Sequence, residues 1–398
     1  MTICIAGKNQ IAIEAVSYLL AKYPQYNYVA CINQTDDGVN SWQPSFRSFC
    51  IANQISILDL KDLYSLGELL FISLEYDRLI IPENFLDARL YNIHFSKLPA
   101  YKGMYTSVFP LLNGEIESGV TLHLINRGID TGPVIDQLTF PLSINTNAAQ
   151  LYDLYLQYSS ILFKRNIESL IAGDIYLIPQ TAGGSTYFSK SSLNFSKIEI
   201  DLNKTAYEIH NQVRAYSFRQ YQLPLILSKM VYKSQMSEEV SEGKPGTHIS
   251  SDNEKIRLNT IDYIIDLYID REEDIVTSSI QGDIATFEEI KKTGYPVKIR
   301  TKEGWDALIV ACYHNQHFFA AHLIKSGWDI NTSNYKGTTA IMYAMTAAVE
   351  GKGFESFQML IKKADLKLND FEGHNIFYYA DKYNITEILQ LLNRKKIF

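Results

Sequence analysis

Three side chains with complementary chemistry fall close together in this 398-residue chain. Asn92 carries an amide donor that cannot ionise, His94 can donate a hydrogen bond or move a proton near neutral pH, and Asp130 supplies a carboxylate. Asn92 and His94 lie two residues apart, so on an extended strand their side chains point to one face. We expect Asp130 to orient His94, raise its pKa and accept a proton through water. This set suits a reaction in which negative charge grows on an oxygen while a proton moves.

The same residue types also occur in purely structural roles. Taken singly, Asn92 and Asp130 are typical of turns, and His94 is typical of a hydrogen-bonded core histidine. His123 fits a functional role and a bracing role beside Asp130 equally well. The chain has no G-x-S-x-G elbow, no H-E-x-x-H and no C-x-x-C, so neither serine hydrolysis nor a metal centre is expected.

The elements that must hold these residues are short apolar runs alternating with helical patterns. This order predicts an α/β domain with a parallel sheet. Residues 148–172 are expected to form one long amphipathic helix of that domain. Leu79–Ile81 is expected to begin a further buried segment. The turn Gly7-Lys8-Asn9 holds one glycine, so it is not a dinucleotide-binding fingerprint. The predicted strands are Thr2–Ala6, Tyr28–Ile32, Ile55–Leu58, Leu69–Leu74 and Tyr91–His94.

The composition excludes several classes of protein. Hydrophobic residues make up 46% and charged residues 20%, which is ordinary for a globular protein. The formal net charge of −7 argues against binding along a nucleic-acid backbone. No apolar run is long enough to cross a membrane, and Met1–Ala6 lacks the basic start of a signal peptide. Four cysteines without C-x-x-C spacing are typical of reduced thiols, so a cytoplasmic location is expected.

Composition and pattern divide the chain into three expected domains: residues 1–184, 185–270 and 271–398. The middle domain is expected to be a small α+β, β-barrel-like module, with a helix over 204–216, a polar loop over 234–244 and strands after it.

The last domain is expected to be an all-α ankyrin-repeat array. Gly304, Gly337 and Gly373 head three similar segments that are 33 and 36 residues apart, and a period near 33 is typical of ankyrin repeats.

Three motifs in the first domain resemble those of the formyltetrahydrofolate-dependent formyltransferases. They are the N-x-H-x-S-x-L-P segment Asn92–Pro99, the G-V-T-x-H segment Gly119–His123 and the Asp-Thr-Gly segment Asp130–Gly132. The order and spacing of the motifs agree with the family as well as their residues do. The resemblance implies a Rossmann-like domain, N10-formyltetrahydrofolate as co-substrate, no metal, and Asn92, His94 and Asp130 as catalytic residues.

The resemblance also implies where the folate binds. In the family the loop before the catalytic asparagine forms the pterin slot, and Leu74–Pro82 matches that position here. Asp77 and Arg78 stand where many relatives have small residues. The expected folate-binding residues are Tyr76, Arg78, Leu79 and Ile80.

The middle domain is similar to that of the sugar N-formyltransferases. The matching stretches are Thr186–Phe188, Ile198–Asp201 and Asn211–Phe218. An arginine fork suits a diphosphate and aromatic rings suit a pyrimidine, although a helix end packed by aromatics explains the pattern equally well. The expected substrate-binding residues are Lys97, Tyr105, Arg214, Tyr216, Phe218 and Arg219.

An ankyrin tail narrows the resemblance to enzymes that act on dTDP-3-amino-3,6-dideoxyglucose, for O-antigen and lipopolysaccharide biosynthesis. This likeness implies a cytoplasmic homodimer with a small nucleotide-sugar substrate and no nucleic-acid or membrane partner. Two alternatives stay open: a formyltetrahydrofolate hydrolase, and an ankyrin adaptor with a degenerate enzyme domain.

The repeats carry an unusual set of aromatic residues. Trp305 follows Gly304 at a position that is normally polar and exposed, and tyrosines lie at related offsets. An exposed tryptophan ringed by tyrosines suits stacking on a flat base. We expect a second nucleotide-sugar site there, with a protein-binding surface and a docking surface for the catalytic domain as equal alternatives. Its residues would be Tyr295, Trp305, Tyr313 and Tyr335.

Overall fold

The computed structural model describes residues 1–384 and 386–396; Ile385 and residues 397–398, at the end of the expected repeat domain, lie outside the described residues. The chain forms two compact units. The first comprises Met1–Gly38 and Pro44–Asp270, and the second comprises Val39–Gln43 and Arg271–Phe398. Among the described helices, none combines the length and apolar character that a membrane span requires.

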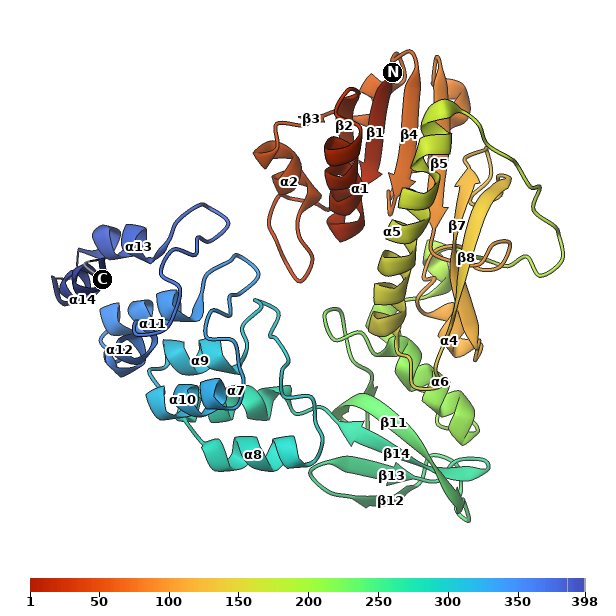
Figure 1. Cartoon of the computed structure of the whole chain (residues 1–398). Coiled ribbons are helices and arrows are strands. Elements are labelled where there is room, and N and C mark those ends of the chain that lie inside the picture. The colour runs from red at the N-terminus through yellow and green to blue at the C-terminus, as the bar shows by residue number, and fades with distance from the viewer. Residues whose placement is uncertain (385, 397–398) are drawn as a thin grey trace. The chain divides into compact units, whose positions relative to one another are not determined.

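The first unit is built on a seven-stranded sheet with the order β3-β2-β1-β4-β5-β7-β8 (Figure 1). The strands from β3 to β5 run parallel, whereas β7 and β8 are antiparallel to their neighbours. The central strands are nearly continuous apolar runs, as expected of strands covered on both faces. The bounds are β1 (Thr2–Gly7), β2 (Asn27–Ile32), β3 (Ser56–Ile57), β4 (Leu69–Leu74), β5 (Ala88–His94), β7 (Glu117–Leu124) and β8 (Val134–Pro141).

The five strands that the sequence predicts are parallel to one another, but two further strands at the edge of the sheet, β7 and β8, are antiparallel. A parallel crossover normally needs a helix long enough to span the sheet. Between β5 and β7 the only α-helix is α4 (Phe109–Leu112), which has four residues. The chain therefore returns beside β5 in the opposite direction and turns back again through residues 125–133 into β8.

Helices α1 (Asn9–Lys22) and α5 (Ala148–Ala172) lie side by side on one face of this sheet (Figure 1). A capping box between Asn147 and Gln150 starts α5, and Gly173 in the left-handed region ends it. The long helix predicted over 148–172 is confirmed. The opposite face packs on the segment that contains α3 (Leu60–Leu63), and α2 (Phe46–Ala52) lies beside α1.

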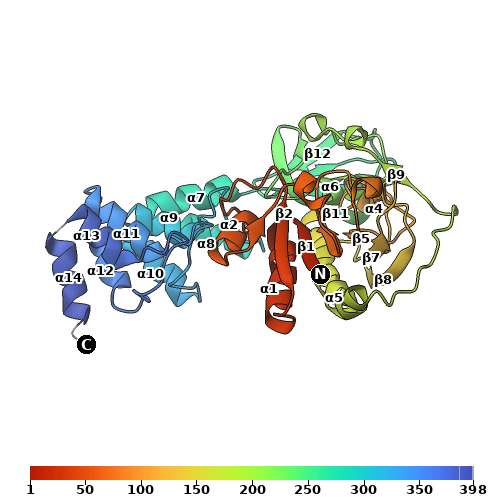
Figure 2. The ribbon, with the colours of Figure 1, turned by 90° about the horizontal axis from the view of Figure 1, so that it is seen from above.

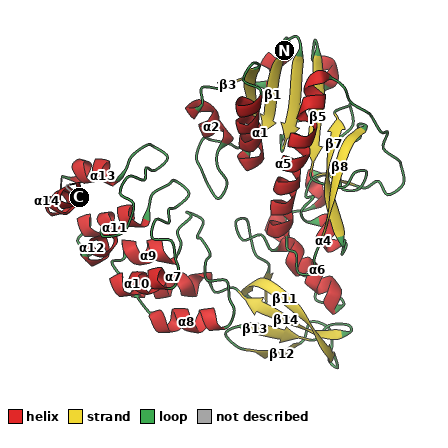
Figure 3. Cartoon of the chain, in the orientation of Figure 1, coloured by secondary structure: helices red, strands yellow, loops and turns green. Residues whose placement is uncertain are grey.

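The first unit also holds a five-stranded antiparallel sheet, ordered β10-β11-β14-β13-β12, that packs on helix α6 (Figure 3). The polar run 234–244 was expected to be a loop, but most of it continues strand β11. Its backbone pairs with β14, and most of its side chains are exposed or half-buried, whereas Ser234 is buried beside His210. Backbone pairing rather than an apolar pattern therefore forms this strand. The bounds are α6 (Ala206–Tyr216), β10 (Leu225–Ile226), β11 (Lys229–Val240), β12 (His248–Ser251), β13 (Lys255–Leu258) and β14 (Tyr263–Ile269).

The second unit consists of helix pairs that follow one another along the chain (Figure 2). The first helix of each pair packs on the first helix of the next, so α9 lies between α7 and α11. The bounds are α7 (Glu272–Gln281), α8 (Ile284–Lys292), α9 (Ala307–Tyr313), α10 (His317–Lys325), α11 (Ala340–Val349), α12 (Glu355–Leu360), α13 (Ile376–Tyr383) and α14 (Thr386–Lys396).

Three equivalent turns recur in this unit. Gly304, Gly337 and Gly373 have φ angles of 82°, 79° and 82°, a region that favours glycine. The N–H of each glycine donates to the carbonyl three residues before it, and the residue two positions after it caps the next helix. The sequence period of 33 and 36 residues is therefore a repeat of the same local structure.

Candidate active site

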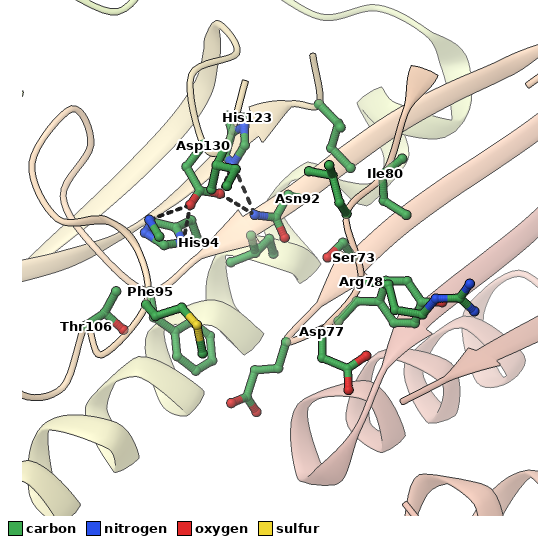
Figure 4. Close-up of a pocket in the computed structure, with 18 of the residues that line it drawn as sticks. Ser73, Asp77, Arg78, Ile80, Asn92, His94, Phe95, Thr106, His123 and Asp130 are labelled. Carbon is green, nitrogen blue, oxygen red and sulfur yellow. Dashed lines mark hydrogen bonds and ion pairs between the residues drawn. The ribbon is translucent and has the colours of Figure 1, made fainter. Parts of the chain in front are cut away.

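Strand β5 ends at the centre of the site. Its register places Asn92 opposite His123 of β7 and beside Ser73 of β4, while His94 is opposite Thr121. Asn92 is half-buried and His94 is buried. The pleat directs both side chains to one face, as the spacing predicts (Figure 4).

Asp130 comes from the turn between β7 and β8 and meets the β5 residues through both carboxylate oxygens (Figure 4). Its Oδ2 accepts a hydrogen bond from the Gly103 N–H at 2.8 Å and lies 3.5 Å from His94 Nδ1. Its Oδ1 accepts from Asn92 Nδ2 at 3.3 Å and lies 3.5 Å from His123 Nε2. The structure thus brings Asn92, His94 and Asp130 together.

The tautomer of His94 follows from its second nitrogen. Nε2 lies 2.8 Å from the Tyr101 carbonyl oxygen, which can only accept, so Nε2 carries the proton. In the neutral ring Nδ1 is then unprotonated and can accept a proton. Burial lowers the pKa of His94 more than the Asp130 charge raises it. The Asp130 charge thus raises the pKa of His94 as expected, but the larger effect of burial makes the net pKa lower than its ordinary value.

His123 is oriented by a backbone carbonyl and in turn orients Asn92. Its Nδ1 lies 2.9 Å from the Leu124 carbonyl oxygen, so Nδ1 is protonated and Nε2 is an acceptor. The Asn92 amide donates to that Nε2 at 3.1 Å. The bracing role considered for His123 therefore acts on Asn92 more directly than on Asp130.

One N–H of Asn92 remains for a ligand. The two acceptors of its amide, His123 Nε2 and Asp130 Oδ1, lie only 3.5 Å apart. They therefore subtend a narrower angle at Nδ2 than the angle between the two N–H bonds of a planar amide. A single N–H pointing between the two acceptors accounts for both contacts, and the other is available to an oxygen in the pocket.

The turn that carries Asp130 is held from outside by the segment 178–188, here called the connector because it leads from α5 toward the second sheet. Gln180 Nε2 donates to the carbonyl oxygens of Asp130 at 2.8 Å and Gly132 at 2.7 Å. Ile178 and Val134 exchange two backbone hydrogen bonds of 2.8 Å. These bonds support Asp130 in its left-handed conformation, with φ of 54°.

The connector also holds the loop that contacts His94. Thr186 Oγ1 accepts from the Tyr101 N–H at 2.7 Å, and Ser185 Oγ accepts from Lys102 Nζ at 3.1 Å. Strands β6 (Lys102–Gly103) and β9 (Tyr187–Phe188) pair in parallel at this point. One segment therefore supports the partners of both His94 and Asp130.

Opposed effects act on the Asp130 carboxyl. Burial raises its pKa, but the rings of His94 and His123 and the Gly103 N–H outweigh burial, so the net pKa is lowered. Asp130 is therefore ionised across the physiological range, and His94 is the better proton acceptor of the two.

We expect the pH dependence of kcat/KM to report His94. Protonated His94 cannot accept a proton, so activity should fall as pH decreases through its pKa. Because burial lowers that pKa from its ordinary value of 6.5, the acid-side midpoint should lie below 6.5. Initial rates measured between about pH 5 and 8 test this, since histidine is the side chain that ordinarily titrates there. A midpoint above 6.5, or a flat profile, would contradict this role.

The four residues expected at the folate all line the same pocket as the Asn92–His94–Asp130 cluster. The pocket has a volume of about 590 Å³ and includes Tyr76, Arg78, Leu79 and Ile80 in its wall. Ile80 is 6% exposed, but Leu79 is 60% and Ile81 is 44% exposed. The expectation of a buried segment at 79–81 is therefore wrong, because the chain forms a lip of the pocket rather than a strand.

The two arginines expected at a diphosphate lie in ion pairs or hydrogen bonds within the protein. Arg214 is 4% exposed and donates to Asn211 Oδ1 and to the carbonyl oxygens of Leu111, Ser143 and Thr146. Arg219 forms an ion pair with Asp270. The arginine fork of Arg214 thus joins α6 to the rest of the first unit.

The remaining residues of that set do not line the pocket either. Phe218 is 7% exposed and packs on Tyr152 and Tyr221, and Tyr216 is partly buried. Lys97 is exposed and pairs with Glu117, and the Tyr105 hydroxyl donates to the Lys190 carbonyl oxygen at 2.9 Å. The alternative of packed aromatics at a helix end accounts for Phe218.

Several polar residues of the pocket escaped the sequence analysis. Three of them follow the carboxyl ends of β1, β2 and β4, the edge where ligands of open α/β sheets bind, and Ser73 lies within β4 just before its end. The turn Gly7-Lys8-Asn9 after the first strand was the available signal, but without a glycine fingerprint it named no ligand. These residues are Lys8, Asn33, Ser73 and Glu75, with Tyr187 and Lys190 contributed by the connector and the turn after it.

The aromatic set in the second unit is only partly accessible. Trp305 is half-buried and contacts Tyr313 and Tyr343, with ring centroids 5.2 and 4.5 Å away. Tyr295 is 4% exposed, which corrects its expected place on a stacking surface, and the Tyr335 ring packs against Gly304. Across the described residues, no group of three His, Cys, Asp or Glu side chains has a metal-binding arrangement.

The chain is similar to formyl-transferring proteins in three comparisons. A family model described as Formyl transferase matches residues 69–167. A methionyl-tRNA formyltransferase of Synechocystis sp. is 32% identical over 182 residues, which is 45% of this chain and 53% of that protein. The chain thus spans about half the length of this relative.

Two solved structures match more of both chains. WlaRD, described as a sugar 3N-formyl transferase in the presence of dTDP and 5-N-formyl-THF, is 41% identical. That match covers 68% of this chain and 97% of WlaRD, with a TM-score of 0.63. An N-formyltransferase from Helicobacter canadensis, in complex with folinic acid and dTDP-3-aminofucose, is 40% identical over 67% of this chain and 99% of its own, also with a TM-score of 0.63.

Proposed function

The chain belongs to the formyltransferase family, and from that premise we propose that it transfers a formyl group from N10-formyltetrahydrofolate to the amine of a dTDP-linked amino deoxysugar. The observation that carries the proposal is the Asn92–His94–Asp130 cluster in the wall of the 590 Å³ pocket. We further propose dTDP-3-amino-3,6-dideoxyglucose as the acceptor.

In the proposed reaction Asn92 stabilises charge and His94 moves a proton. The acceptor amine forms a C–N bond to the formyl carbon, and the bond from that carbon to N10 breaks. The second N–H of Asn92 donates to the formyl oxygen as negative charge develops on it. His94 Nδ1 takes the proton that the amine loses and returns a proton to N10. Ionised Asp130 stabilises the transient imidazolium, so the protein ends the reaction unchanged.

The pocket suits a folate co-substrate. Pockets for drug-sized ligands span about 300–1,000 Å³, so a volume of about 590 Å³ is sufficient for a pterin and an adjoining amine. Leu79 and Ile80 supply apolar surface for a flat ring, and the Asp77–Arg78 pair beside them is polar. The protein's own residues do all the proton transfer, and no step in the proposed reaction needs a metal.

The acceptor class rests on the likeness to the two sugar-modifying relatives, whose descriptions name dTDP or a dTDP-3-amino sugar. The net charge of −7 makes a tRNA acceptor the weaker choice, since tRNA binding needs cationic surface. O-antigen and lipopolysaccharide biosynthesis, a cytoplasmic location and a homodimer belong to the same proposal.

Mass spectrometry on the purified protein tests the proposal. The protein is mixed with N10-formyltetrahydrofolate and a panel of dTDP- and UDP-linked amino sugars, and each sugar is examined for the gain of one CO. A gain on a dTDP-3-amino sugar supports the proposal. Release of tetrahydrofolate without a formylated sugar supports the hydrolase. If neither event occurs, the result supports a different acceptor or the adaptor.

For the second unit we propose ankyrin-type repeats and a second nucleotide-sugar site at Trp305, Tyr313 and Tyr343. The close contacts of these three rings and Lys352, whose Nζ lies 3.4 Å from the Tyr313 ring centroid, offer an aromatic surface beside a cation. Soaking crystals with a dTDP-sugar should place the base on Trp305, and Trp305→Ala should abolish that density. An ordered but empty surface at saturating ligand would favour a protein-binding or docking role.

A further inference from the structure

Three strand ends converge on a polar part of the pocket. The registers place Ile32 of β2, Gly7 of β1 and Leu74 of β4 side by side. The next residues of the three strands are Asn33, Lys8 and Glu75, and all three line the pocket. Because β2 and β4 flank β1 on opposite sides, this is the switch point of the parallel sheet, where crevices for ligands form.

Asn33 carries an unsatisfied acceptor at this point. Its side chain is fully buried, and Nδ2 donates to the Glu75 carbonyl oxygen at 2.9 Å. Its Oδ1 is also buried and has no hydrogen-bond partner in the described part of the chain. Buried polar atoms in native proteins are nearly always paired, so this oxygen calls for a donor from a ligand.

Glu75 offers a second acceptor. It is held in the left-handed region with φ of 60°, and its Oε2 accepts from the Tyr152 hydroxyl at 2.7 Å. Burial raises the pKa of Glu75, and the positive charge of Lys8 opposes that rise. A left-handed conformation with a half-buried carboxylate is typical of binding sites rather than of structural loops.

The register also places Glu75 beside the strand that carries the proposed reacting groups. Leu74 is beside Ile93 of β5, so Glu75 and His94 follow at the same level on adjacent strands. Adjacent strands lie about 4.8 Å apart, which is comparable with the width of a pyranose ring. In Figure 4, Ser73 of β4 lies next to Asn92, on the same side of the pocket.

We propose that Asn33 and Glu75 bind the hexose of the acceptor, with sugar hydroxyls donating to Asn33 Oδ1 and to the Glu75 carboxylate. This inference rests on the proposed function. Two acceptors require a ligand with several donors, which hydroxyls provide and a phosphate does not. Asn33 and Glu75 thus select and orient the sugar rather than the nucleotide. In this orientation the amine of the sugar faces His94.

Glu75→Gln tests this assignment, because it removes the charge and keeps the shape. The KM for dTDP-3-amino-3,6-dideoxyglucose should rise about 10- to 100-fold, as expected for loss of a charged hydrogen bond. The Kd of dTDP, which has no hexose, and the KM of N10-formyltetrahydrofolate should stay within about twofold of wild type. Glu168→Gln, at an exposed position of α5 outside the pocket, is the matched control and should change none of the three.

Each other outcome overturns the assignment. A rise in the KM for N10-formyltetrahydrofolate alone would show that the Glu75 carboxylate binds the pterin. Weaker binding of dTDP would show that it binds the nucleotide, and no change would show that Glu75 binds neither substrate. If Glu75→Gln does not fold, a wild-type complex with the sugar nucleotide decides: a sugar hydroxyl must lie within about 3.2 Å of Asn33 Oδ1. Wild-type protein that binds the sugar nucleotide but transfers no formyl group would refute the proposed function without refuting this site.

Discussion

Replacing Asp130 by asparagine is expected to lower kcat by about 10³-fold, the loss typical of removing one preorganised electrostatic partner. The asparagine oxygen can still accept from the Gly103 N–H, so the turn should keep its shape. What is lost is the negative charge 3.5 Å from His94 Nδ1, which stabilises the ring once it has accepted a proton. The KM values for both substrates should change much less than kcat.

Single-turnover formyl transfer and thermal melting of Asp130→Asn separate catalysis from folding. Asp174→Asn is the matched control, since Asp174 is exposed and lies outside the pocket, and it should behave as wild type. Turnover of Asp130→Asn within about tenfold of wild type, in a protein that melts normally, would remove Asp130 from the proposed mechanism.

Replacing Arg214 by alanine is expected to cost about 3 kcal/mol of unfolding free energy, because it deletes a buried cation and strands its partners. Its guanidinium donates to Leu111, Ser143 and Thr146 carbonyl oxygens and to Asn211 Oδ1. For a unit of this size the melting temperature should fall by about 5–10 °C. Below the transition, the KM for the sugar nucleotide should stay within about twofold of wild type.

The comparison with Arg165→Ala makes the Arg214 result specific. Arg165 is an exposed arginine of α5 paired with Asp136, and such pairs contribute less than about 1 kcal/mol. If Arg214→Ala melts like Arg165→Ala while the KM for the sugar nucleotide rises tenfold or more, the residue faces the diphosphate as its sequence context suggests.

The Asn92–His94–Asp130 cluster was predictable because its three members lie in motifs with fixed local geometry. Asn92 and His94 share a strand, and the period of a strand is enough to place both side chains on one face. The pocket lip at Tyr76–Ile80 was placed by resemblance alone, and the sequence pattern wrongly predicted burial for Leu79. Apolar residues at a pocket mouth and in a core look alike until the backbone is traced.

The polar end of the pocket could not be predicted, since its residues are far apart in sequence and have no motif in common. Lys8, Asn33 and Glu75 are brought together only by the registers of β1, β2 and β4. The internal hydrogen bonds of Arg214 could not be predicted from the sequence for a related reason. An arginine near aromatics is equally typical of a phosphate site and of a packed helix end, and only the carbonyls around it distinguish the two.

The connector limits how this protein can be recombined with its relatives. Residues 178–188 join two sheets and would be the natural crossover point for chimeras that exchange the second sheet and the helix before it. Yet Gln180 and Thr186 hydrogen-bond the backbone around Asp130 and Tyr101. A functional exchange must therefore keep the connector with the seven-stranded sheet and join the foreign sequence after Phe188.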